Sequence, residues 1–177
     1  LNLALQDHLN DSQEFIEVLG KKFKLGDRVL QTKNNYELES KIENEFYEDK
    51  QKGVFNGDLG YISKIDKENK KLTVVFDDVR SVEYSSDNLD ELALAYAMTI
   101  HKSQGSEFPV VVIPIYRAAP MLLTRNLIYT AITRASKAVV LVGISDYLMK
   151  MIENNRTRKR YSKLGKKLRD QDEIKRG

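Results

Sequence analysis

The chain has 177 residues, of which 41% are hydrophobic and 31% charged, with a formal net charge of +3, no cysteine and two histidines. This length and composition predict a globular protein with one domain, or a domain carrying a small insertion. The lack of cysteine excludes disulfides and thiolate zinc sites and favours the reducing cytoplasm. His8 and His101 are too few for a histidine-built metal centre. No apolar run is long enough to span a bilayer, so we expect no membrane association.

The positive charge is concentrated at the C-terminus. Ten Lys or Arg and three Asp or Glu lie between Arg156 and Gly177, a net of +7, which leaves −4 for residues 1–155. Residues 155–177 therefore form a basic tail, which either follows the phosphates of a nucleic acid or is a solvated terminal helix. Because the chain begins with Leu inside an amphipathic helical pattern, LNLALQDHLN, we expect it to be a piece of a longer polypeptide.

Residues 1–20 are expected to be helical, because large apolar residues recur there at roughly helical spacing. They are Leu1, Leu5, Leu9, Phe15, Ile16 and Leu19. A polar break at residues 10–12 could cap a second short helix. Gly20 is expected to end it.

Residues 21–90 predict a small antiparallel β-barrel. Four short segments rich in β-branched and aromatic residues are separated by turn residues. These segments are RVLQT, LGYISKI, KLTVVF and SVEYS. Residues 37–52 are too charged for a core strand, and we expect a protruding loop or a short helix there.

Beyond residue 90 the pattern changes to continuous apolar runs, LALAYAM, VVVIPI and KAVVLVGI, with helical periodicity in NLIYTAITRA. Apolar runs with a helix between them predict a parallel sheet covered on both faces, so this part is α/β and the barrel is an insertion into it.

The polar stretch TIHKSQGSEF, residues 99–108, is expected to lie at the carboxyl end of a parallel strand, where ligands bind. Four of its residues are of types that contact phosphates: Thr99, His101, Lys102 and Ser103. Gly105 permits close backbone approach, and Glu107 could accept hydrogen bonds from ribose hydroxyls. The alternative is a solvated turn with a glycine cap.

Two arginines, Arg125 and Arg134, bracket the predicted helix. Arg134 falls at its C-terminal end. Its guanidinium either satisfies the terminal carbonyls or acts as an arginine finger on a transferred γ-phosphoryl group.

Taken together, TIHKSQGSEF between two apolar runs, followed by LIYTAITRA, closely resembles motifs five and six of superfamily-one helicases. GDRVLQTKNNY (26–36) and VFNGDLGYI (54–62) resemble the barrel segment of RecD-like helicases, the RecD/TraA family. LNLALQDHLN and NNRTRKRYSKL are also similar to that family.

This resemblance implies an α/β fold: a partial RecA-like second motor domain, of the P-loop NTPase type, with an inserted small antiparallel barrel of Src-homology-3 type. The start of the motor domain would occupy residues 1–20 and the barrel residues 21–90. Motifs five and six would lie in residues 91–154, before the basic tail at 155–177.

The resemblance also implies the function and the site. The chain would be the C-terminal half of an ATP-dependent 5′ to 3′ DNA helicase of the kind used in DNA repair and recombination. Thr99, His101, Lys102 and Ser103 would contact the DNA backbone. The nucleotide would meet Gly105, Glu107 at its ribose, and Arg134 at its γ-phosphate.

In the barrel, the resemblance implies that Lys33, Asn34, Asn35 and Tyr36 could hold single-stranded DNA, with Tyr36 stacked on a base. The alternatives are that this part only braces the motor and that Tyr36 is a core aromatic.

The chain contains neither G-x-x-x-x-G-K-[ST] nor an obvious strand-ending Asp-Glu pair. ATP and Mg²⁺ would therefore be bound mostly by the N-terminal motor domain of the same polypeptide, and the chain alone is expected to be inactive. We expect a monomer. A Pif-type or phage-type helicase and a non-catalytic nucleic-acid-binding module stay open as alternatives.

Overall fold

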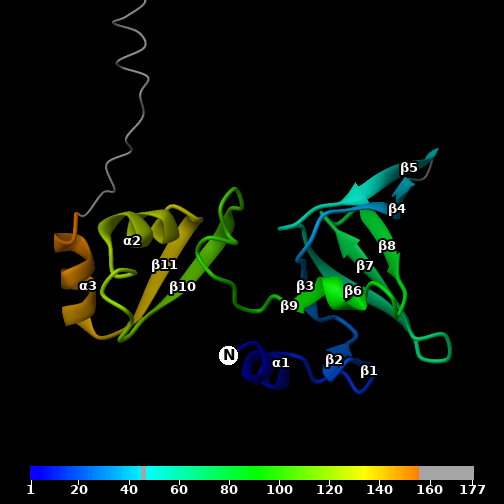
Figure 1. Ribbon diagram of the computed structural model, residues 1–177, viewed down its shortest axis with the longest axis horizontal. Helices are drawn as coiled ribbons and strands as arrows, with labels where there is room; N and C mark the ends of the chain where they lie inside the picture. Colours follow the sequence, from blue (N-terminus) through cyan, green and yellow to red (C-terminus); the bar gives the residue numbers. More distant parts are fainter. Residues whose placement is uncertain (45–46, 156–177) are drawn as a thin grey trace, which may run out of the picture. The chain divides into compact units, whose positions relative to one another are not determined.

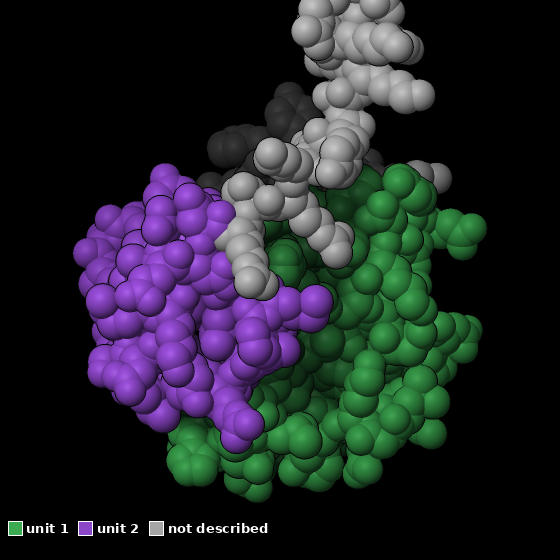
Figure 2. Space-filling view, turned by 60° about the vertical axis from the view of Figure 1, so that its left-hand side comes forward, with its two compact units in different colours: residues 1–105 green, residues 106–177 purple. Residues whose placement is uncertain are grey.

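The computed structural model describes residues 1–44 and 47–155, with only the backbone described between residues 42 and 52. The chain divides into two compact units, residues 1–105 and residues 106–177, which are coloured separately in Figure 2. The basic tail beyond residue 155 lies outside the described residues.

The first unit contains a curled, seven-stranded antiparallel sheet (Figure 1), and its strands follow the order β5-β4-β8-β7-β6-β3-β9. A separate hairpin, β1 with β2, and two short helices complete the unit. The helices are α1 (Asn2–Leu9) and the 3₁₀ turn η1 (Leu89–Glu91). The strands are β1 (Phe15–Val18), β2 (Lys21–Lys24), β3 (Arg28–Gln31), β4 (Asn35–Asn44), β5 (Tyr47–Val54), β6 (Leu59–Asp66), β7 (Lys71–Phe76), β8 (Arg80–Tyr84) and β9 (Leu92–Leu94).

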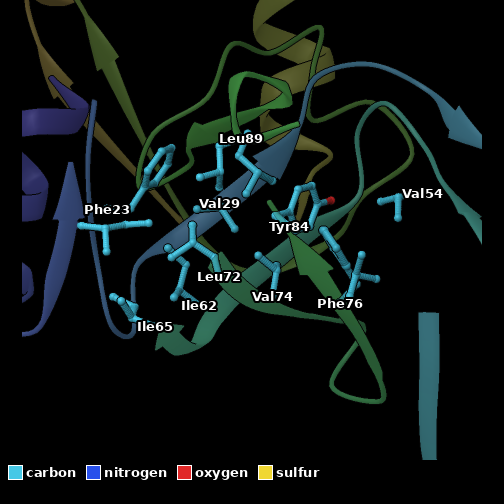
Figure 3. Close-up of a cluster of buried hydrophobic side chains, with 13 residues drawn as sticks. Phe23, Val29, Val54, Ile62, Ile65, Leu72, Val74, Phe76, Tyr84 and Leu89 are labelled. Atoms are coloured by element: carbon cyan, nitrogen blue, oxygen red, sulfur yellow. The ribbon is translucent and has the colours of Figure 1, made fainter. Parts of the chain in front are cut away.

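The core of this sheet follows the two-residue period of its strands. In β7, Leu72, Val74 and Phe76 are buried, whereas the residues between them are only half-buried. They pack with side chains from neighbouring strands, including Ile62 and Tyr84 (Figure 3). Full burial of such a side chain stabilises the fold by about 1.5–3 kcal/mol. The strands predicted from RVLQT, LGYISKI, KLTVVF and SVEYS are all confirmed.

The helix expected after residue 10 is wrong. Residues 15–18 form β1, which pairs with β2 so that Ile16 lies opposite Phe23. Both of these side chains are buried, whereas Phe15 and Glu17 are exposed. The buried and exposed residues of β1 thus alternate as in a strand. Because β1 has only four residues, this alternation cannot be distinguished from helical spacing in the sequence.

The loop or short helix expected at residues 37–52 is also wrong. This segment belongs to β4 and β5, an antiparallel pair that includes Lys41 opposite Lys50. In β4, Leu38 and Ser40 face inward, while Glu37, Glu39 and Lys41 are exposed. The charged residues occupy one solvated face of a strand, which is compatible with sheet pairing.

The second unit contains a two-stranded parallel sheet with one helix in the connection and another after it. Its elements are β10 (Phe108–Ile115), α2 (Arg125–Ile132), β11 (Ala135–Gly143) and α3 (Ser145–Glu153). Thr124 caps α2, because its hydroxyl accepts a hydrogen bond from the N–H of Leu127 at 3.3 Å. The predicted helix and both flanking strands are confirmed here.

The expected strand over LALAYAM is wrong in length and in partner. Only Leu92–Leu94 are extended, and this β9 pairs antiparallel with β3 rather than with the parallel strands. The parallel pair also lacks the expected cover on both faces, because Val110 and Val112 in β10 are 53% and 61% exposed. Apolar composition alone does not reveal which sheet a strand joins.

Candidate nucleotide and nucleic-acid interface

The motif stretch is divided between the two units. Thr99 to Gly105 belong to the first unit and Ser106 to Phe108 to the second. Residues 99–105 lie in turns between β9 and β10 and precede a parallel strand. The expected position after the carboxyl end of such a strand is therefore wrong, because β9 is not part of the parallel sheet.

The turn at residues 99–103 is built by its own backbone and hydroxyl groups. The carbonyl oxygen of Thr99 accepts hydrogen bonds from the N–H groups of Lys102 at 2.9 Å and Ser103 at 3.2 Å. The Ser103 hydroxyl donates to the carbonyl oxygen of Ile100 at 2.9 Å, and Ser103 is buried. Thr99, His101 and Lys102 are exposed. The turn thus presents an imidazole and an ammonium to solvent, whereas the Ser103 hydroxyl serves the turn itself.

Gly105 follows with a φ of +89°, a conformation that favours glycine. A Cβ atom at this position would meet nothing within 4 Å. The glycine is therefore explained by its backbone conformation and not by a close neighbour.

Glu107 and Arg134 come together in the second unit. Arg134 lies between the end of α2 and the start of β11, as predicted. Its Nη1 donates to the carbonyl oxygen of Ser106 at 3.1 Å, and its own carbonyl oxygen accepts from the N–H of Phe108 at 2.8 Å. Arg134 is thus bonded to both neighbours of Glu107, whose side chain is exposed.

The guanidinium of Arg134 also satisfies a helix terminus. Its Nε donates to the carbonyl oxygen of Thr130 at 3.3 Å, in the last turn of α2. Nη2 lies 3.5 Å from the Thr133 hydroxyl, so three of its five N–H groups have partners. Carbonyl capping is therefore present, and within the described part of the chain the other two N–H groups of the guanidinium have no partner. Arg125 has a different role, because its Nε donates to the carbonyl oxygen of Ile152 at 2.6 Å and so joins α2 to α3.

In the first unit, Tyr36 is exposed, so the core alternative for this aromatic is wrong. Its exposed fraction is 66%, and its ring meets Phe55 edge-on at 5.8 Å between centroids. Asn34 joins the segment before Tyr36 to the turn after Phe55, because its Oδ1 accepts a hydrogen bond from the N–H of Asn56 at 2.9 Å. Sequence reasoning missed Phe55, although an aromatic directly before Asn56-Gly57 is a signal that could have found it.

Lys33 and Asn35 are engaged with acidic residues. Nζ of Lys33 lies 2.9 Å from the Asp90 carboxylate. Hydrogen bonding and charge attraction within this pair raise the pKa of Lys33, and the hydrogen bond from Lys33 lowers the pKa of Asp90. The Asn35 amide donates to Glu91 at 3.1 Å, and its Oδ1 accepts from the N–H of Glu37 at 3.0 Å. Asn35 thus shapes the backbone beside Tyr36.

A shallow pocket of about 300 Å³ lies in the second unit, next to α3. It is lined by Arg117, Ala118, Pro120, Leu123, Tyr147, Lys150 and Asn154. Sequence reasoning missed it, because its residues come from a loop and a helix that share no motif.

Across residues 1–44 and 47–155, no three His, Cys, Asp or Glu side chains gather in a way that could hold a metal ion. In the same part of the chain, none of the helices is long and apolar enough to cross a membrane.

Two protein families match the chain. Residues 1–76 match the SH3 domain of ATP-dependent RecD-like DNA helicases, and residues 94–142 match the UvrD-like helicase C-terminal domain.

Several relatives and one solved structure match part of the chain. An ATP-dependent RecD2 DNA helicase of Deinococcus radiodurans is 38% identical over 76% of this chain and 16% of its own length. An uncharacterised protein of Methanocaldococcus jannaschii is 33% identical over 75% of this chain and 12% of its own length. The RecD subunit of the RecBCD enzyme of Mycobacterium tuberculosis is 36% identical over 51% of this chain and 15% of its own length. A Bacteroides Pif1 helicase structure aligns at 20% identity with a TM-score of 0.38, covering 76% of this chain and 36% of that one. The chain therefore spans less than a fifth of the length of these three relatives.

Proposed function

Since the chain belongs to the RecD-like family of superfamily-one helicases, we propose that it is the C-terminal part of an ATP-dependent DNA helicase that moves 5′ to 3′ on single-stranded DNA. In this proposal the N-terminal motor domain of the same polypeptide supplies the P-loop and holds most of ATP and Mg²⁺. The motor acts as a monomer in the cytoplasm, in DNA repair or recombination. Residues 1–20 and 91–154 belong to the second, RecA-like motor domain, residues 21–90 form its inserted barrel, and the basic tail follows.

The observation that carries the proposal is the bonding of Arg134 to both neighbours of Glu107. Residues 27 positions apart in sequence thereby present a carboxylate and a guanidinium at one end of the parallel strands. A carboxylate suits the hydroxyls of a ribose, and a guanidinium with unused N–H groups suits a phosphate. Gly105, with its open left-handed turn, precedes this pair in the chain.

ATP supplies the γ-phosphoryl group whose transfer to water releases the free energy for movement. The role of Arg134 is electrostatic: its fixed charge stabilises the negative charge that develops on that group. The bonds to Ser106 and Thr130 hold the guanidinium in place, which reduces the reorganisation needed during the reaction. Glu107 orients the nucleotide.

Contact with DNA is assigned to the first unit. Thr99, His101 and Lys102 face solvent on the turn before Gly105 and meet backbone phosphates, while Ser103 keeps that turn in shape. On the barrel, Tyr36 offers an exposed ring to a base, and Phe55 supports it from the side. Lys33 and Asn35 precede Tyr36 in the chain and are assigned to the same DNA contact, although both are bonded to acidic residues here.

The experiment that tests the proposal uses the complete polypeptide that carries this chain. Arg134→Ala should abolish DNA-stimulated ATP hydrolysis while single-stranded DNA still binds. Arg117→Ala is the matched control, because it removes an exposed arginine from the same unit. If Arg134→Ala turns over ATP like the wild type, the arginine-finger role is rejected.

Two alternatives make different predictions about the same polypeptide. A non-catalytic nucleic-acid-binding module predicts that no P-loop is encoded upstream in the same reading frame. A Pif-type helicase predicts an upstream region without the long N-terminal part of helix-hairpin-helix character that RecD-like enzymes carry.

A further inference from the structure

Asp27 is a fully buried carboxylate that accepts hydrogen bonds from four groups. It is 0% exposed and lies between β2 and β3. Its donors are the Gln6 amide, the Asn10 amide at 2.6 Å, the N–H of Lys24 at 2.7 Å and the Tyr96 hydroxyl at 2.8 Å. A buried carboxylate is tolerated when its oxygens are satisfied in this way.

These donors come from segments far apart in the chain. Gln6 lies in α1, Asn10 directly follows α1, and Tyr96 lies two residues after β9. Asp27 therefore joins the N-terminal helix to the segment that leads into the motif turn. Burial, and to a smaller extent the hydrogen bond to Asp27, raise the pKa of Tyr96. Its hydroxyl therefore stays protonated and able to donate at neutral pH.

The same face of α1 holds this segment at a second point. Asn2 and Gln6 are spaced by four residues and so lie along one side of the helix. The Asn2 amide donates to the carbonyl oxygens of Leu94 and Ala97, each at 3.0 Å. Its Oδ1 accepts from the N–H of Ala97 at 2.7 Å.

On its other side the segment is held by the sheet. Leu94 pairs with Val29 of β3, and the N–H of Ala95 donates to the carbonyl oxygen of Arg28 at 2.8 Å. Residues 94–97 are thus bonded both to α1 and to β3. The next exposed residue, Thr99, begins the turn that carries His101 and Lys102.

We propose that Asp27, Tyr96 and Asn2 are positioning residues: with α1 they form a polar clamp that fixes the direction in which the turn at residues 99–103 leaves the barrel. This inference rests on the proposed DNA contact of that turn. A buried polar network whose members are all satisfied holds the backbone in one arrangement, because another arrangement would leave a buried polar group unpaired. The clamp therefore determines where Lys102 is presented to a DNA backbone.

The test uses the complete polypeptide and measures ATP hydrolysis against the concentration of single-stranded oligonucleotide. Tyr96→Phe removes one hydroxyl and leaves Asp27 with three donors, and Asn2→Ala releases Ala97. Each should raise the oligonucleotide concentration for half-maximal stimulation by about threefold or more, because one or more hydrogen bonds are lost. Turnover at saturating DNA should stay within about twofold of the wild type.

The control is Tyr61→Phe, because it removes a half-buried tyrosine hydroxyl from the same unit and keeps the ring that lies 5.7 Å from the Arg28 guanidinium. It should leave the DNA dependence unchanged.

A double variant separates positioning from general stability. If Tyr96 acts through the turn, Tyr96→Phe should have a smaller effect in a Lys102→Ala background than alone. Lys102→Ala by itself should raise the oligonucleotide concentration that gives half-maximal stimulation of ATP hydrolysis. If Lys102→Ala does so while Tyr96→Phe and Asn2→Ala match the wild type, the clamp is rejected and the proposed function stands. If Lys102→Ala has no effect either, the proposed DNA contact of the turn fails, and the inference fails with it.

Discussion

The guanidinium of Arg134 donates a hydrogen bond to the carbonyl oxygen of Ser106 across 3.1 Å, and this bond ties the end of α2 to the residue before Glu107. Arg134 therefore has a structural partner in addition to the proposed phosphate.

Arg134→Lys distinguishes these two roles. Lysine keeps the charge and can still bond one carbonyl, but it lacks the planar fork that can hold a carbonyl and a phosphoryl oxygen together. We expect a loss of roughly 10³-fold in DNA-stimulated turnover, close to that of Arg134→Ala. Steady-state ATP hydrolysis by the complete polypeptide measures it. Recovery of most of the turnover by lysine would show that carbonyl capping is the whole role.

Tyr36→Ala should weaken single-stranded DNA binding by roughly 5- to 100-fold, because one base loses its stacking partner. Tyr36→Phe should bind almost normally, since the ring is kept. Fluorescence anisotropy with a labelled oligonucleotide measures both. Tyr116→Ala is a matched control, because Tyr116 is also 66% exposed but lies in the second unit. Equal losses for Tyr36→Ala and Tyr116→Ala would contradict a specific stacking role for Tyr36.

Asp90→Asn should strengthen binding to single-stranded DNA, because it removes the carboxylate that holds the Lys33 ammonium at 2.9 Å. One additional phosphate contact should make the dependence of log affinity on log salt steeper by about 0.7. Anisotropy titrations at several salt concentrations test this. Asp87→Asn removes an exposed carboxylate nearby in sequence and serves as the control. A salt slope equal to that of the wild type would mean that the freed Lys33 does not meet a phosphate.

The same ion pair predicts a pH dependence. Because the pKa of Asp90 is lowered in the fold, its contribution to stability is present above the usual carboxyl pKa and is lost as the pH falls below about 4. Because the pKa of Lys33 is raised, its contribution is present at neutral pH and is lost only as the pH rises above about 10.

Lys33→Ala should therefore raise the pKa of Asp90 towards its usual value, as followed by NMR of the carboxyl carbon. Asp66 is the internal control, because its pKa is lowered chiefly by hydrogen bonds from Asn69 and should not move. An unchanged pKa of Asp90 would exclude the ion pair in solution.

Tyr84→Phe should destabilise the first unit by about 1–3 kcal/mol, because it leaves the buried Oε1 of Gln31 without its donor. The Tyr84 hydroxyl is 2.8 Å from that oxygen, and burial raises its pKa, so it remains a donor at neutral pH. Urea unfolding measures the change. Tyr129→Phe, at a residue that is 68% exposed, should change the stability by less than about 0.5 kcal/mol.

Several elements could be predicted from sequence because their patterns are local. The period of β7 and the turn residues around it were sufficient to predict the antiparallel sheet. Residues 126–135 have a helical period and a position directly before an apolar run, which placed Arg134 at a helix end. The resemblance of TIHKSQGSEF and LIYTAITRA to helicase motifs five and six implies Glu107 and Arg134 as candidates for one nucleotide site.

Other features could not be predicted because they depend on long-range pairing. The sequence pattern predicts a helix at Ile16, since a four-residue strand offers too few positions to show its period. The apolar run beginning at Leu92 predicts a strand of the parallel sheet, whereas its backbone pairs with Val29 and Leu30 of β3. The exposure of Tyr36 likewise depends on how the segment at Asn34 meets the turn at Asn56.

By itself, the sequence determined the order of the motifs, the absence of a P-loop and cysteine from these 177 residues, and local elements such as β7 and α2, because each depends on neighbouring residues. Only the tertiary structure decided that β9 completes the antiparallel sheet, that Arg134 is bonded to both neighbours of Glu107, and that Asp27 joins α1 to Tyr96. The physical reason is that hydrogen bonds between residues 28 to 95 positions apart depend on how the chain folds back on itself, which no local period records.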